Sequence, residues 1–124
     1  MATEDQCVTI HPYFDVKEGE QENVRAYLEK FVELTKSEQD CLYYGFSFSG
    51  NQLHCREGYK NGAGALAHLE NVGPLLQEML GSGKVELKDL QIHGPEKEVA
   101  KLREPLAPLN PSYWVLEYGF RKPA

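Results

Sequence analysis

Apolar and polar residues alternate along residues 41–49 and again along 52–59, on either side of Gly50-Asn51. A period of two is typical of a half-buried strand, and a two-residue connection containing glycine is typical of a tight hairpin. Pairing the strands about this turn predicts one shared face made of Leu42, Tyr44, Phe46 and Phe48 opposite Tyr59, Glu57, Cys55 and Leu53. Glu57 is the one charged residue there, so its carboxylate must find a hydrogen-bond partner, reach water or hold a proton.

Four further elements are predicted on either side of the hairpin. Residues 7–16 alternate as a strand, in which Pro12 predicts a sheet edge or a bulge. Residues 20–38 carry apolar side chains at helical spacing with charges on the other side. Asn61 is a suitable N-cap for a second helix over residues 62–72, after which Gly73 predicts a helix end and Pro74 the start of a new short helix over 74–80.

The C-terminal third predicts a strand, a short helix and a last strand. Residues 84–93 alternate but change phase in the middle, which indicates a β-bulge near Lys88-Asp89. Gly94-Pro95 precedes a short apolar-periodic helix, and prolines at 105, 108 and 111 close it. Residues 113–120 are rich in aromatic side chains and predict a fifth strand, which either extends the sheet or exchanges with another copy.

This order predicts an α+β fold. When strands and helices in this order are joined by right-handed crossovers, they give a ferredoxin-like βαββαβ antiparallel sheet with both main helices on one face. We expect one domain over residues 1–124, with a core at about 7–93 and a helix-strand extension at about 94–124. The other face of the sheet stays uncovered and suits a partner sheet, which predicts a homodimer. Its expected members are Thr9, His11, Tyr13, Tyr43, Gly45, Ser47, His54 and Arg56.

Composition narrows the classes of partner. The 124 residues include 13 basic and 19 acidic side chains, a net charge of −6, which argues against nucleic acid and anionic membranes. No apolar run approaches the roughly 18 residues of a membrane span, and the N-terminal residues are acidic where a signal peptide is basic. We therefore expect a cytoplasmic protein. Cys7, Cys41 and Cys55 show no metal-binding spacing, and the predicted pairing points Cys41 and Cys55 to opposite faces.

Glu57-Gly58-Tyr59 is followed nine positions after the tyrosine by His68, and then by Pro74 and an apolar helical segment. In these residues the chain resembles the antibiotic biosynthesis monooxygenase family, over roughly residues 7–93. The resemblance implies a dimeric α+β barrel with a pocket between helices and sheet in each subunit. It also implies oxygenation of phenol-like or quinol-like substrates without metal or bound cofactor, because the substrate anion itself donates an electron to oxygen.

Carried over to this chain, the resemblance makes His68, Glu57 and Tyr59 the candidate catalytic residues. The hairpin pattern adds Tyr44, Phe46 and Phe48 as candidate contacts to a small aromatic or apolar ligand. Relatives that degrade haem use a tryptophan at the position of Tyr59 and an asparagine on the first strand, which has none here. We expect neither metal nor cofactor.

Two other interpretations use the same residues. In a non-enzymatic ligand-binding or stress-type barrel, Glu57 would only orient an apolar metabolite. In an isomerase, Glu57 and His68 would move a proton without oxygen. His68 lies at the edge of its helix's apolar arc, from which the side chain reaches either the pocket rim or solvent.

Overall fold

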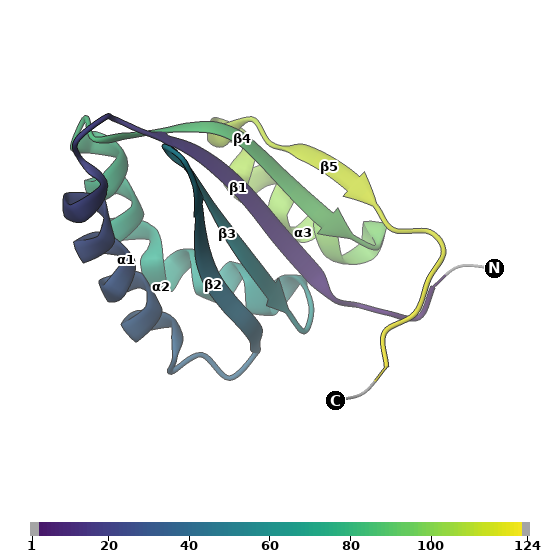
Figure 1. The fold of residues 1–124 in the computed structure, drawn as a ribbon. Helices are drawn as coiled ribbons and strands as arrows, with labels where there is room; N and C mark the ends of the chain where they lie inside the picture. Colours follow the sequence, from purple (N-terminus) through teal and green to yellow (C-terminus); the bar gives the residue numbers. More distant parts are fainter. Residues whose placement is uncertain (1–2, 123–124) are drawn as a thin grey trace.

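The computed structural model describes residues 3–122 and contains one mixed sheet with its helices on one face (Figure 1). The elements in chain order are β1 (Val8–Val16), α1 (Gln21–Thr35), β2 (Cys41–Ser49), β3 (Gln52–Tyr59), α2 (Gly62–Gly81), β4 (Val85–Gly94), α3 (Glu96–Leu106), the 3-10 helix η1 (Ala107–Leu109) and β5 (Ser112–Val115). The strand order is β2-β3-β1-β4-β5. The first four strands are antiparallel, which confirms the predicted ferredoxin-like arrangement.

The hairpin register agrees with the prediction except at its open end. Tyr44 pairs with Glu57 as expected, but Tyr59 pairs with Cys41 because a bulge intervenes between Cys41 and Tyr43. The extra residue is Leu42, whose side chain is exposed rather than facing the core. The prediction that Leu42 lies opposite Tyr59 is therefore wrong. Cys41 takes the inward position instead, so Cys41 and Cys55 share a face, although both thiols are free.

Pro12 does not lie on a sheet edge. β1 is flanked by β3 and β4, and pairing with β3 is interrupted at His11 and Pro12, where the proline has no N–H to donate. On the other side, Tyr13 pairs with Asp89 and Phe14 with Leu87, so Lys88 is an extra residue in β4. The bulge predicted near Lys88-Asp89 is confirmed.

α2 continues through Gly73-Pro74 as a single helix, so the predicted break into two helices is wrong. A proline inside a helix removes one backbone hydrogen bond and crowds the preceding turn. Here Val72 before it and Met79 after it are buried in the same core cluster. Packing against the sheet on both sides of Pro74 holds the two halves of the helix in line.

The fifth strand is shorter than predicted. β5 covers Ser112–Val115 and runs parallel to β4 along its outer edge, so it extends the chain's own sheet. Beyond it, the Leu116 N–H donates to the Gly94 carbonyl, and the Glu117 carbonyl then accepts a hydrogen bond from the Thr3 N–H. Tyr118 and Phe120, which the aromatic pattern placed in the strand, are exposed.

Candidate functional site

The start of α2 determines where His68 lies. The Asn61 side chain accepts a hydrogen bond from the Gly64 N–H at 2.9 Å, which confirms the predicted N-cap. A side chain at Gly62 would lie 2.5 Å from the Glu98 backbone oxygen, so glycine lets α2 begin close against α3. With the helix anchored here, His68 lies two turns in and faces β3.

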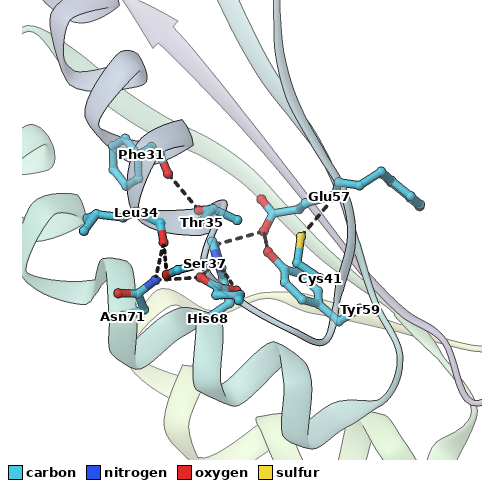
Figure 2. Close-up of polar contacts among 11 residues, drawn as sticks. Phe31, Leu34, Thr35, Ser37, Cys41, Glu57, Tyr59, His68 and Asn71 are labelled. Carbon is cyan, nitrogen blue, oxygen red and sulfur yellow. Dashed lines mark hydrogen bonds and ion pairs between the residues drawn. The ribbon is translucent and has the colours of Figure 1, made fainter.

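The structure brings the three predicted catalytic residues into contact (Figure 2). Glu57 and Tyr59 lie on the inner face of β3, and the Tyr59 hydroxyl donates to Glu57 Oε1 at 2.7 Å. His68 Nε2 lies 3.4 Å from the same carboxylate oxygen. The hairpin pattern predicts Tyr44, across the strand pair, as the neighbour of Glu57. In the structure the Glu57 carboxylate accepts instead from Tyr59, two residues along the same strand.

His68 has a second carboxylate partner, Glu38, which the sequence pattern does not predict. Glu38, in the connection between α1 and β2, lies with its Oε2 2.9 Å from His68 Nδ1. Asn71, one turn further along α2, donates to the same oxygen at 2.8 Å and to the Leu34 carbonyl at 3.0 Å. Glu38 was missed because it falls among charged residues at a helix end, a pattern typical of solvated side chains.

Burial shifts the acid-base properties of this cluster. His68, Glu57 and Tyr59 are exposed by 2%, 5% and 0%. Burial raises the pKa of Glu57 to about 7, although hydrogen bonds from Tyr59 and Cys55 favour the charged form. Burial also lowers the pKa of His68, although the hydrogen bond to Glu38 and the charge of Glu38 both raise it. Near neutral pH, the site therefore combines a neutral imidazole with a carboxyl group that readily gains or loses a proton.

The hydrogen bond to Glu38 selects one form of the neutral imidazole. Because the Glu38 carboxylate only accepts, His68 Nδ1 carries the hydrogen and Nε2 keeps its lone pair. That lone pair is directed toward Glu57. A histidine oriented in this way by a carboxylate is the arrangement of a general base.

A cavity of about 60 Å³ lies between α2 and the sheet, with Glu57 and His68 in its wall. This is roughly four to six times the space that one water molecule needs. Tyr44 and Phe46, two of the predicted substrate contacts, also line it. Phe48 does not, since its ring packs under the Arg25 guanidinium at 4.8 Å. Tyr59 lies behind Glu57 and supports that carboxylate from outside the cavity.

Two features are absent from the part of the chain that the structure describes. Within residues 3–122, no group of three or more His, Cys, Asp or Glu side chains is arranged to hold a metal ion. In the same part of the chain, no helix combines the length and apolar character needed to cross a bilayer.

Fold and site together define a ferredoxin-like α+β protein with a buried carboxylate-histidine cluster. Among solved structures, MupZ from Pseudomonas fluorescens is 40% identical, with a TM-score of 0.89 over 96% of this chain and 91% of that chain. The chain belongs to the same family as MupZ.

More distant structures share the fold alone. A conserved protein from Methanosarcina mazei is 16% identical, with a TM-score of 0.61 over 71% of this chain and 89% of that chain. A Bacteroides thetaiotaomicron protein described as a "Possible Oxidoreductase" is 16% identical, with a TM-score of 0.56 over 71% of this chain and 96% of that chain. No protein-family model matches the sequence, and no curated protein matches it either.

Proposed function

We propose that this chain is a cofactor-independent monooxygenase that oxidises a small phenol-like or quinol-like substrate in the cavity beneath α2. The observation that carries the proposal is the position of His68 Nε2, which is oriented by Glu38 and lies beside Glu57 in an otherwise apolar cavity wall. Such a cavity excludes water, so a substrate anion formed there is poorly solvated and more reactive. The family resemblance and the distant neighbour described as a "Possible Oxidoreductase" support the same class of reaction.

The proposed reaction begins with proton transfer. A substrate hydroxyl placed beside His68 loses its proton to Nε2, and Glu38 stabilises the resulting imidazolium. The phenolate supplies electrons to O2 and forms a carbon-oxygen bond at the ring. The proton on His68 Nε2 then passes to the outer oxygen of the resulting ring peroxide. Nε2 next removes the hydrogen of the same ring carbon as the O–O bond breaks, and protonated Glu57 gives its proton to the departing hydroxide, which leaves as water. The proton now on Nε2 returns to Glu57 and restores the starting state. A phenol and one O2 thereby give a quinone and one water, with the substrate supplying every electron.

Oxygen uptake during turnover of simple phenols and para-quinols tests this function. The expected result is one O2 consumed per substrate, with no added metal, flavin or haem. Product formed without oxygen uptake would instead indicate the isomerase, which uses the same two groups for proton transfer alone. Binding without turnover would favour the ligand-binding barrel and would contradict the proposal.

A Glu38→Gln variant is expected to lower kcat about tenfold, because a neutral amide replaces a charge-assisted hydrogen bond to the imidazolium. The pKa of His68 should fall further, since the Glu38 charge now holds it up. Nitrogen-15 NMR of labelled histidine during a pH titration measures that shift directly. Glu33→Gln, on the exposed side of α1, is the matched control and should leave both values unchanged. An unshifted His68 titration in Glu38→Gln would remove Glu38 from the mechanism.

We also propose that two copies pair through the uncovered face of the sheet. The Tyr13 and His54 rings stack there with centroids 4.3 Å apart, His11 and His93 lie 4.5 Å apart, and Trp114 stacks on His93 at 5.6 Å. Tyr13 and Trp114 are exposed, and exposed aromatic patches of this kind are typical of interfaces. Native mass spectrometry should show twice the mass of the chain, and a Tyr13→Glu variant should shift the distribution toward monomer. A wild-type protein that stays monomeric at micromolar concentration would contradict this pairing.

A further inference from the structure

The polar groups of the cavity lie at one end of it, as the strand registers show. Ile10, Glu57 and Tyr44 are paired across β1, β3 and β2, and all three line the cavity. The next inward-facing level toward the Tyr59 end contains Val8 and Tyr59, which are paired with each other and do not line it. The cavity therefore closes directly beyond Glu57.

In the opposite direction the lining continues along the strands. Pro12, Cys55 and Phe46 line the next level, and Phe14 with its partner Leu87 lines the one after. From Ile10 to Phe14 the strand advances about 13 Å, at roughly 3.3 Å per residue. Every lining residue on these two levels is apolar apart from Cys55, whose thiol is buried and neutral because burial raises its pKa.

α2 covers the same length from the other side. Its lining side chains run from His68 through Val72 and Leu76 to Met79. Eleven helical residues correspond to about 16 Å, at roughly 1.5 Å per residue. The lining therefore covers similar lengths on the strands and on α2, and an apolar channel extends from His68 and Glu57 toward Met79.

Among residues 3–122, no lysine or arginine lines this channel. A carboxylate, phosphate or ammonium group placed in it would be desolvated without an opposite charge at the apolar end, which is strongly unfavourable. The small volume of about 60 Å³ further favours a slender molecule over a branched or broadly fused one. Met79, a flexible side chain, forms the end wall and is able to adjust to the length of a ligand.

We infer that the substrate is a slender, elongated and uncharged molecule, with one polar group bound at Glu57 and His68 and a hydrocarbon part extending along α2 to Met79. This inference rests on the proposed function for the identity of the polar end. The prediction of a hydrocarbon part rests on the residues that line the channel, and it does not depend on which reaction takes place.

A series of para-alkylphenols, from para-cresol to para-hexylphenol, tests the inference. Binding is measured by calorimetry under argon, so that oxygen chemistry plays no part. Affinity should rise about threefold to fourfold for each added methylene until the chain reaches Met79. Affinity that does not change with chain length would overturn the inference, whether or not the protein consumes oxygen.

A Met79→Trp variant should weaken binding of para-hexylphenol at least tenfold and leave binding of para-cresol within about twofold. The matched control is Leu75→Trp, on the same helix but outside the lining, which should bind both phenols as the wild type does. Leu87→Phe narrows the same end from β4 and serves if the tryptophan variant does not fold. An equal loss of both phenols in the lining variants would show that the channel does not hold the hydrocarbon part.

Discussion

A His68→Ala variant is expected to reduce kcat/KM for a phenolic substrate by about 10² to 10⁴-fold, the usual contribution of a general base. The imidazole is the one group in the site whose lone pair is directed toward Glu57 while a carboxylate stabilises its protonated form. Removing it leaves the substrate hydroxyl without a proton acceptor, although the apolar cavity remains. Steady-state rates of oxygen uptake across a range of substrate concentrations provide the measurement.

The control for this variant is His93→Gln, which changes a histidine on the opposite face of the sheet. It should retain wild-type kcat/KM. Added imidazole should partly restore His68→Ala, because the deletion leaves a space of the right shape beside Glu38. A loss below about threefold in His68→Ala would remove His68 from the mechanism and leave Glu57 as the only candidate base.

A Glu57→Gln variant is expected to be more stable than the wild type above pH 7 and nearly equal to it below pH 5. Burial raises the pKa of Glu57 from 4.5 to about 7, so between these values the folded protein holds a proton that the unfolded chain has released. The free energy of unfolding of the wild type therefore falls as pH rises through this window, in total by up to about 3 kcal/mol. Glutamine has no proton to lose and avoids this cost.

Urea denaturation of both proteins at pH 5 and pH 8 measures the effect. The lowered pKa of His68 acts in the opposite direction, but it is present in both proteins and largely cancels in the comparison. Glu98→Gln is the contrasting control: a hydrogen bond from the Gly62 N–H lowers the pKa of Glu98, so neutralising it should destabilise the fold at pH 8. If the free energies of unfolding of Glu57→Gln and wild type differ by the same amount at pH 5 and pH 8, Glu57 does not titrate in this window.

Several features of the site could be predicted because they depend on local periodicity. Alternation about Gly50-Asn51 placed Tyr44 opposite Glu57, and the cap at Asn61 set the phase that carries His68. A phase change in the apolar pattern revealed the bulge at Lys88, since one extra residue reverses every later side chain. These signals lie within a few residues of the structure they determine.

Other features depended on contacts between distant parts of the chain. Glu38 reaches His68 from thirty residues away, and nothing in its neighbours distinguishes it from a solvated carboxylate. Pro74 stays inside α2 because residues of the helix before and after it pack against the sheet. Leu42 faces outward because of a β-bulge that the alternation of the sequence does not predict. Phe48 matches the pattern of a cavity residue, but it lies on the edge strand β2, where its ring packs under Arg25 and does not line the cavity.

By itself, the sequence determined the order of the main strands and helices and an inward-facing carboxylate at Glu57, because hydrophobic burial imposes a period on each element. It left His68 between the pocket rim and solvent. Only the tertiary structure decided that these two groups meet, that Glu38 orients the histidine and that both lie at the closed end of an apolar channel. Those outcomes depend on how α2 and the α1–β2 connection pack on the sheet, and the free energy of that packing comes from residues far apart in the chain.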